Sequence, residues 1–138
     1  MSTVLPLSLA GCAGTIDSAE LATRLATSGQ VPVVLDVRSG DEYEAGHLLG
    51  AINIPVLALP FQMTAVPVRV RSEPVVVYCA HGPRAGLAGF FLRLAGFSQV
   101  YHLLGDIRVW RDEGRPLVTG AFVGARIFGN RTSPTLGR

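Results

Sequence analysis

The chain lacks lysine entirely, and all 12 of its basic residues are arginines. A Schiff base or a lysine general base needs a primary amine on a side chain, so both kinds of chemistry are excluded. The arginines are spread from Arg24 to Arg138 without a dense cluster, and the formal net charge is only +2. Because nucleic-acid binding needs concentrated positive charge, we expect no nucleic-acid partner.

Cysteine is also scarce, with only Cys12 and Cys79 present. Two cysteines are too few for a disulfide framework, and neither lies in a pattern with zinc-site spacing, so we expect no metal. This usage favours a reducing compartment, and we expect a cytoplasmic protein. The alternative is a lipoprotein modified at Cys12, because "LAGC" at 9–12 has the small residues of a lipoprotein cleavage site. That pattern is poorly met, since no Lys or Arg precedes it and Pro6 interrupts it.

Long hydrophobic runs are absent, although 49% of the residues are hydrophobic. No run approaches the length of a membrane-spanning helix, so we expect no membrane span. A chain of 138 residues has the usual size of one domain. We expect an N-terminal arm over 1–15, the folded domain over 16–118 and a mobile C-terminal tail over 119–138.

Apolar runs of strand length alternate with segments of helical periodicity. The expected strands are 31–37, 51–54, 74–79 and 99–103. The expected helices begin at Asp17, at Ser39 or Asp41, at Pro83 and at Asp106. This alternation predicts an α/β fold with a mostly parallel central sheet of about five strands and helices on both sides.

Two further expectations concern packing. In the helix that begins at Pro83, Leu87, Phe91 and Leu94 share one stripe, which we expect to face the core. We also expect Phe90, Phe91 and Trp110 to pack in the core or at the sheet edge.

The segment "CAHGPRA" at 79–85 carries the candidate chemistry. Cys79 ends a strand, Gly82 permits a tight turn, and Pro83 suits the first position of a helix. Inward-pointing amides and a helix N-terminus make a site for an anion, to which Arg84 adds a full charge. The same field favours the thiolate form of Cys79, which makes it a candidate nucleophile. The alternative is a buried structural thiol, with Arg84 an ordinary solvated residue.

Four longer segments give the chain a family resemblance. They are "VVLDVRSGDEYEAGHLLGAINIP", "VVVYCAHGPRA", "LAGF" followed by "VYHLLGDIRVW", and "EGRPL". In this order they resemble a single-domain rhodanese, a sulfurtransferase, over roughly 16–117, so the domain at 16–118 is expected to be rhodanese-like. The loop from Cys79 to Arg84 has the six residues of that family, whereas dual-specificity phosphatases carry one more.

The resemblance implies a two-step reaction without a cofactor. The Cys79 thiolate would take the outer sulfur of a donor such as thiosulfate, forming a persulfide. Cyanide or a cellular thiol, or a sulfur-acceptor protein, would then remove that sulfur. The persulfide charge would be stabilised by backbone amides of the loop, namely those of Ala80, His81, Gly82, Arg84 and Ala85. Two other functions stay open: a non-catalytic or regulatory binding module, and, less favoured, a small cysteine-dependent phosphatase.

Residues around the loop carry further expectations. Asp36 and Arg38 end the neighbouring strand, where an ion pair would brace the site unless it is a plain surface pair. His81 would orient a donor or acceptor, or would only be a solvated loop residue.

The sequence departs from the family pattern at two places. Pro83 has no N–H, so the loop loses one potential donor. Gly105 is followed by Asp106 where the family usually has a glycine pair; we expect Asp106 to cap its helix and to add a side chain near the site. We interpret His47 and His102 as structural.

Overall fold

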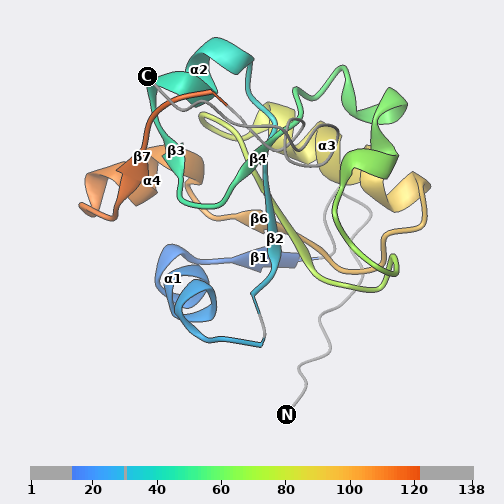
Figure 1. The fold of residues 1–138 in the computed structure, drawn as a ribbon, viewed down its shortest axis with the longest axis horizontal. Coiled ribbons are helices and arrows are strands. Elements are labelled where there is room, and N and C mark those ends of the chain that lie inside the picture. Colours follow the sequence, from blue (N-terminus) through green and yellow to red (C-terminus); the bar gives the residue numbers. More distant parts are fainter. Residues whose placement is uncertain (1–13, 30, 122–138) are drawn as a thin grey trace, which may run out of the picture.

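The computed structural model of the protein describes residues 14–29 and 31–121. Its centre is a five-stranded sheet with the order β1-β6-β5-β2-β4, in which every pairing is parallel (Figure 1). The strands are β1 (Gly14–Ile16), β2 (Val33–Asp36), β4 (Ile52–Asn53), β5 (Val75–Tyr78) and β6 (Val100–Leu103). The predicted α/β class and mostly parallel sheet are therefore confirmed. The edge strand β1 was not among the expected strands.

Helices follow the strands and begin close to the expected residues. They are α1 (Ser18–Ala26), α2 (Gly40–Ala45), α3 (Pro83–Leu94) and α4 (Asp106–Asp112). The predicted cap at Asp17 is present, since its carboxylate accepts the N–H of Glu20 at 2.8 Å. Ser39 caps α2 through a reciprocal pair of hydrogen bonds with Glu42, which decides between the two expected caps.

Helices cover both faces of the sheet. In Figure 1, α1 and α4 lie on the left of the strands and α3 on the right. The alternation of side chains along a strand divides β5 between two cores. Val75 and Val77 pack with α3, whereas Val76 and Tyr78 pack with α1 and α4. Cys79 continues this alternation, so its side chain belongs to the α3 side.

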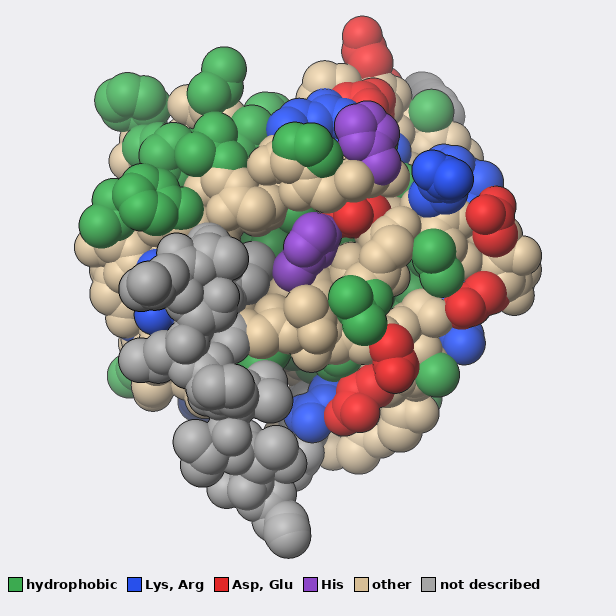
Figure 2. Space-filling view, turned by 180° about the vertical axis from the view of Figure 1, so that it is seen from behind, with side chains coloured by type: hydrophobic (Ala, Val, Ile, Leu, Met, Phe, Trp, Pro, Cys, Tyr) green, Lys and Arg blue, Asp and Glu red, His purple; other side chains and the backbone are tan. Residues whose placement is uncertain are grey.

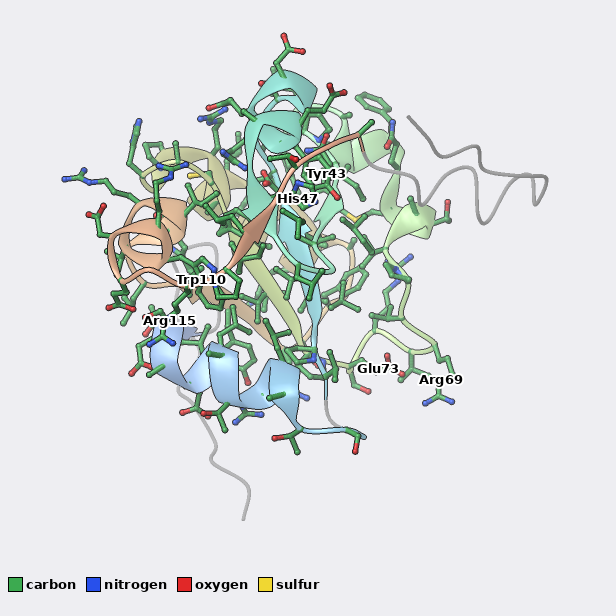
Figure 3. All side chains as sticks on the ribbon, turned by 60° about the vertical axis from the view of Figure 1, so that its left-hand side comes forward. Tyr43, His47, Arg69, Glu73, Trp110 and Arg115 are labelled. Carbon is green, nitrogen blue, oxygen red and sulfur yellow. The ribbon has the colours of Figure 1, made fainter. Side chains whose placement is uncertain are left out.

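A second, smaller sheet closes the domain. Strands β3 (His47–Leu48) and β7 (Leu117–Val118) pair in antiparallel orientation, which joins the end of the domain to the segment after α2. His47 is buried, its ring stacks on Tyr43 with 3.5 Å between centroids, and its Nδ1 lies 2.7 Å from the Tyr43 carbonyl oxygen (Figure 3). These contacts fit a structural His47.

The proline-containing segment between β4 and β5 forms no long helix. It contains two short 3₁₀ helices, η1 (Leu59–Phe61) and η2 (Met63–Ala65). Nearer β5, Arg69 and Glu73 form an exposed pair at 3.5 Å, visible at the lower right of Figure 3. The prolines at 60 and 67 explain why the apolar residues here cannot propagate a regular helix.

The predicted core stripe of α3 is wrong. Of the stripe, Leu87 and Leu94 are 40% and 71% exposed, and only Phe91 packs partly against the core. Phe90, which we expected in the core or at the sheet edge, is 48% exposed. The buried face consists instead of small residues and one leucine, namely Ala85, Ala88, Gly89 and Leu92. Hydrophobic side chains gather at the upper left of Figure 2, on the side where α3 and the segment between β4 and β5 lie. Small residues let α3 approach the sheet closely, and its larger side chains are left outside.

The predicted cap of α4 is also wrong. The residue before the helix is Gly105, and the structure gives α4 no side-chain cap. Asp106 is the first helical residue and has a positive φ of 54°, which is uncommon outside glycine. Its carboxylate accepts the N–H of Cys79. Trp110 is buried at 3% exposure, as expected.

Among the described helices, none combines the length and apolar character needed to cross a bilayer. Cys12 lies outside the described residues, as do 1–13 of the expected arm and 122–138 of the expected tail.

The turn before α4 predicts a sharp requirement for glycine at 105. Gly105 has φ +80°, and a Cβ there would lie 2.1 Å from Val109 Cγ2. Gly105→Ala should therefore lower the free energy of unfolding by about 3 kcal/mol, through strain and a steric clash together. Urea denaturation followed by circular dichroism measures this loss.

The matched control is Gly114→Ala. Gly114 has a similar φ of +73°, but a Cβ there meets nothing within 4 Å. Only the backbone cost remains, about 1 kcal/mol. Equal losses in the two variants would contradict the clash with Val109.

Candidate active site

Cys79 occupies the position expected of a ligand-facing residue in a parallel sheet. It follows the last residue of β5, at the carboxyl end of the sheet, where such folds bind ligands. Its side chain packs with Val77 and Ala85 in the core under α3, and the residue is only 1% exposed. The thiol therefore lies at the base of the loop that connects β5 to α3.

The loop after Cys79 directs a backbone amide at the sulfur. The N–H of Gly82 donates to Cys79 Sγ at 2.9 Å. Gly82 adopts φ 125° and ψ −53°, a conformation that residues with a Cβ rarely take. Pro83 begins α3, as the sequence predicted. The sulfur thus faces the N-terminal, positive end of a 12-residue helix.

The backbone of Cys79 is held from the opposite side by the start of α4. Its N–H donates to Asp106 Oδ1 at 2.9 Å, and its carbonyl accepts the N–H of Ile107 at 3.2 Å. The same Asp106 oxygen lies 2.8 Å from His102 Nε2, and Asp106 is 3% exposed. Sequence reasoning placed Asp106 near the site but missed this contact, because the carboxylate was assigned to a helix cap.

Arg84 makes a contact that the sequence did not predict. Its guanidinium forms a two-point ion pair with Glu42 of α2, at 2.6 and 3.1 Å. The hydrogen bond from Arg84 lowers the pKa of Glu42 to about 2, against an opposing effect of burial. The same bond raises the pKa of Arg84, to which the nearby charge of Cys79 adds. Arg84 thus remains within electrostatic reach of the thiol, with much of its charge balanced by Glu42.

Asp36 and Arg38 form a buried ion pair, not a surface pair. Arg38 Nη2 lies 2.6 Å from Asp36 Oδ2, and the two side chains are 4% and 0% exposed. Burial lowers the pKa of Arg38, but the hydrogen bond and charge of Asp36 outweigh it, so the pKa is raised overall. Arg38 also donates to the carbonyl of Gly46 at 2.7 Å. The pair ties the end of β2 to the end of α2.

Two buried tyrosines stand beside this pair. Tyr78 accepts the N–H of Leu48 at 3.1 Å, and the Arg38 guanidinium lies 5.6 Å from the centroid of its ring. Burial, with the charge of Asp36 second, raises the pKa of Tyr78 and raises that of Tyr43 to about 12. Both hydroxyls therefore stay neutral at physiological pH, which makes them fixed hydrogen-bonding groups.

The loop residues named from the sequence lie together, but in different environments. His81 is exposed, Ala80 is partly buried, and Ala85 is fully buried under α3. Of their five amides, that of Gly82 has a described hydrogen bond to the sulfur. The roles of the other four amides and of His81 stay predictions.

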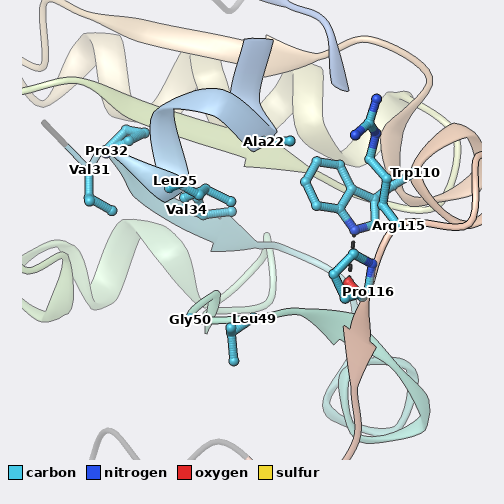
Figure 4. A pocket seen from close by; sticks show the side chains of 11 residues that line it. Ala22, Leu25, Val31, Pro32, Val34, Leu49, Gly50, Trp110, Arg115 and Pro116 are labelled. Atoms are coloured by element: carbon cyan, nitrogen blue, oxygen red, sulfur yellow. Dashed lines mark hydrogen bonds between the residues drawn. The ribbon is translucent and has the colours of Figure 1, made fainter. Parts of the chain in front are cut away.

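An apolar pocket of about 390 Å³ lies elsewhere in the molecule (Figure 4). Val31, Pro32 and Val34 line it at the amino end of β2, and Trp110 and Arg115 form another wall. Because β2 and β5 are parallel, this pocket lies toward the opposite end of the sheet from Cys79. None of its lining residues belongs to the loop. Among the described residues, no group of His, Cys, Asp and Glu could hold a metal ion.

Comparison with known proteins assigns the chain to a family. The rhodanese-like domain matches residues 17–113. A sulfurtransferase from Allochromatium vinosum is 33% identical over 103 residues, which cover 75% of this chain and 92% of that protein. The thiosulfate sulfurtransferase GlpE of Pseudomonas fluorescens is 35% identical over 82 residues, covering 59% of this chain and 72% of that protein.

A solved structure agrees with these relatives. The human single-domain sulfurtransferase TSTD1 superposes with a TM-score of 0.62 at 28% identity, covering 72% of this chain and 96% of that one. The family region, 17–113, includes the loop at Cys79 and four of the five strands of the sheet, all but β1. The chain belongs to the rhodanese-like sulfurtransferase family.

Proposed function

We propose that the protein transfers sulfane sulfur from a donor such as thiosulfate to cyanide or a thiol through a persulfide on Cys79. The observation that carries this proposal is the contact between the Gly82 N–H and Cys79 Sγ at the N-terminus of α3. An amide and a helix terminus both stabilise negative charge on sulfur, in the thiolate and in the persulfide. Because Cys79 would already be a thiolate before the donor binds, no separate general base is needed.

The first step moves one sulfur atom onto Cys79. The thiolate attacks the outer sulfur of thiosulfate, a new sulfur–sulfur bond forms, and the bond to the sulfonate sulfur breaks. Sulfite leaves with that electron pair, while the transferred atom keeps its negative charge as the end of a persulfide. The amides of Ala80, His81, Gly82, Arg84 and Ala85 are proposed to stabilise that charge.

The second step returns the thiolate. Cyanide or a thiolate attacks the terminal sulfur, the persulfide bond breaks, and Cys79 leaves with its electron pair. No cofactor is needed, because the sulfur is carried covalently throughout. The acceptor is proposed to be a small thiol or a sulfur-acceptor protein in the cytoplasm.

The two other functions make different predictions. A regulatory binding module would hold an anion at the loop without forming a persulfide. A phosphatase would release phosphate from an aryl phosphate, and the short loop from Cys79 to Arg84 argues against it. The family relatives named for sulfur transfer support the sulfurtransferase over both.

The persulfide is testable by intact-protein mass. After incubation with thiosulfate and desalting, the wild type should gain one sulfur atom, and cyanide should remove it with formation of thiocyanate. Cys79→Ser should gain nothing and should keep its circular dichroism spectrum, because a hydroxyl is a poor nucleophile but a close steric match. A mutant that turns over at the wild-type rate would refute the proposal.

The ion pair between Arg84 and Glu42 predicts a pH-dependent contribution to stability. Glu42 has a folded pKa of about 2, below its ordinary value of 4.5, so its contribution is complete above 4.5 and is lost as pH falls toward 2. Glu42→Gln keeps an oxygen for the cap at Ser39 but removes the charge. The variant should be less stable than the wild type by about 0.5–1 kcal/mol at neutral pH, and this difference should vanish as the pH approaches 2. Urea denaturation across this pH range measures it.

Glu20→Gln is the control for loss of a surface charge. Glu20 and Arg24 form an exposed pair within α1 at 2.9 Å, about half exposed on both sides. If Glu20→Gln loses as much free energy of unfolding as Glu42→Gln, with the same pH dependence, the ion pair between α2 and α3 has no specific contribution to stability.

A further inference from the structure

Asp106 places a buried negative charge directly behind the proposed nucleophile. Its Oδ1 accepts the N–H of Cys79 at 2.9 Å, and its Oδ2 would lie 3.9 Å from a Cβ on Gly82. The carboxylate therefore adjoins both ends of the turn from Cys79 to Gly82. At 3% exposure it is poorly screened by water, so its field reaches the loop.

The backbone at Asp106 adopts an unfavourable conformation. Asp106 is the one described residue other than glycine with a positive φ, at 54°. An asparagine or glycine would suit that conformation equally well or better, so the backbone conformation does not explain the charge. The first residue of a helix is also a usual place for an acidic side chain, but this carboxylate accepts the N–H of Cys79, and α4 has no side-chain cap.

The other charged side chains around the loop are paired with permanent opposite charges. Arg84 is paired with Glu42, and Arg38 with Asp36. Among the described residues, the ion-pair partner of Asp106 is His102, whose ring balances the carboxylate only when it is protonated. The exposed His81 carries no permanent charge either. With a neutral His102, the charges of the named side chains around Cys79 sum to about one negative charge.

We propose that Asp106 is a specificity-determining residue that selects against doubly charged sulfur donors in favour of singly charged ones. The proposal rests on sulfur transfer through Cys79. A donor must bring its outer sulfur to a thiolate whose own backbone N–H is bound by a fixed carboxylate. Each additional negative charge on the donor is therefore repelled, while the amides of the loop still accommodate one anionic group.

Thiosulfate and methanethiosulfonate form a matched pair of donors for the test. The first carries two negative charges and releases sulfite; the second carries one and releases methanesulfinate. In both, the Cys79 thiolate attacks the outer sulfur and the leaving group departs with the electron pair of the broken bond. They differ chiefly in charge, because methanethiosulfonate has a methyl group where thiosulfate has a third, charged oxygen.

The experiment measures kcat/KM for both donors at about pH 8.5, where imidazole side chains are ordinarily neutral, with cyanide as the acceptor. In Asp106→Asn an amide oxygen can still accept the Cys79 N–H, but the charge is gone. The ratio of kcat/KM for thiosulfate to that for methanethiosulfonate should rise by about five- to tenfold relative to wild type. Asp106→Gly, which suits the positive φ, should raise the ratio in the same direction.

Asp112→Asn controls for net charge, because Asp112 is the exposed last residue of the same helix, α4. This variant should leave the ratio within about twofold of wild type. A ratio unchanged in both Asp106 variants, with both donors affected equally, would overturn the proposal and leave Asp106 a structural residue. If neither donor places a sulfur on wild-type Cys79, it is the proposed function that fails, so the two failures are distinguishable.

Discussion

The site depends on the two hydrogen bonds that fix the backbone of Cys79 to the start of α4. Its N–H is held by Asp106 and its carbonyl by the N–H of Ile107. The parallel ladder ends at Tyr78, so without these contacts the next residue would have unpaired polar groups in the core. With the backbone fixed, the side-chain alternation of β5 sends the thiol toward α3, where Gly82 meets it.

The sequence was sufficient for four of the five strands of the main sheet and for the loop, but not for the edge strand β1. Continuous apolar runs predicted buried parallel strands, and the order of a strand, Cys79, Gly82 and Pro83 predicted a thiol at a helix N-terminus. Both depend on local pattern, which is why they could be predicted. The packing of α3 was predicted wrongly for the opposite reason. Its large residues formed the most apolar stripe, but the sheet accepts only the small face that contains Ala85 and Ala88.

The charged partners at the site were equally hard to predict, because they come from elements distant in sequence. Glu42 and Arg84 are 42 residues apart, and nothing in either local segment selects the other. Asp106 had a plausible local role as a helix cap, and only the position of β5 beside β6 shows that its carboxylate has a different partner. A local motif is enough to name the candidate nucleophile, whereas its electrostatic surroundings can be described only once the fold is known.

These surroundings alter what the resemblance alone would suggest. An arginine in the loop predicts an anion site with a free positive charge, but Glu42 balances Arg84 and Asp106 adds a buried negative charge. In the proposed reaction, stabilisation of a sulfur anion would then fall mainly to backbone dipoles, which act over a short distance and favour charge located on the sulfur itself. A loop of this kind can stabilise a thiolate or persulfide without attracting highly charged ligands. If sulfur transfer proceeds as proposed, nucleophile activation and donor binding are separable properties of the same loop.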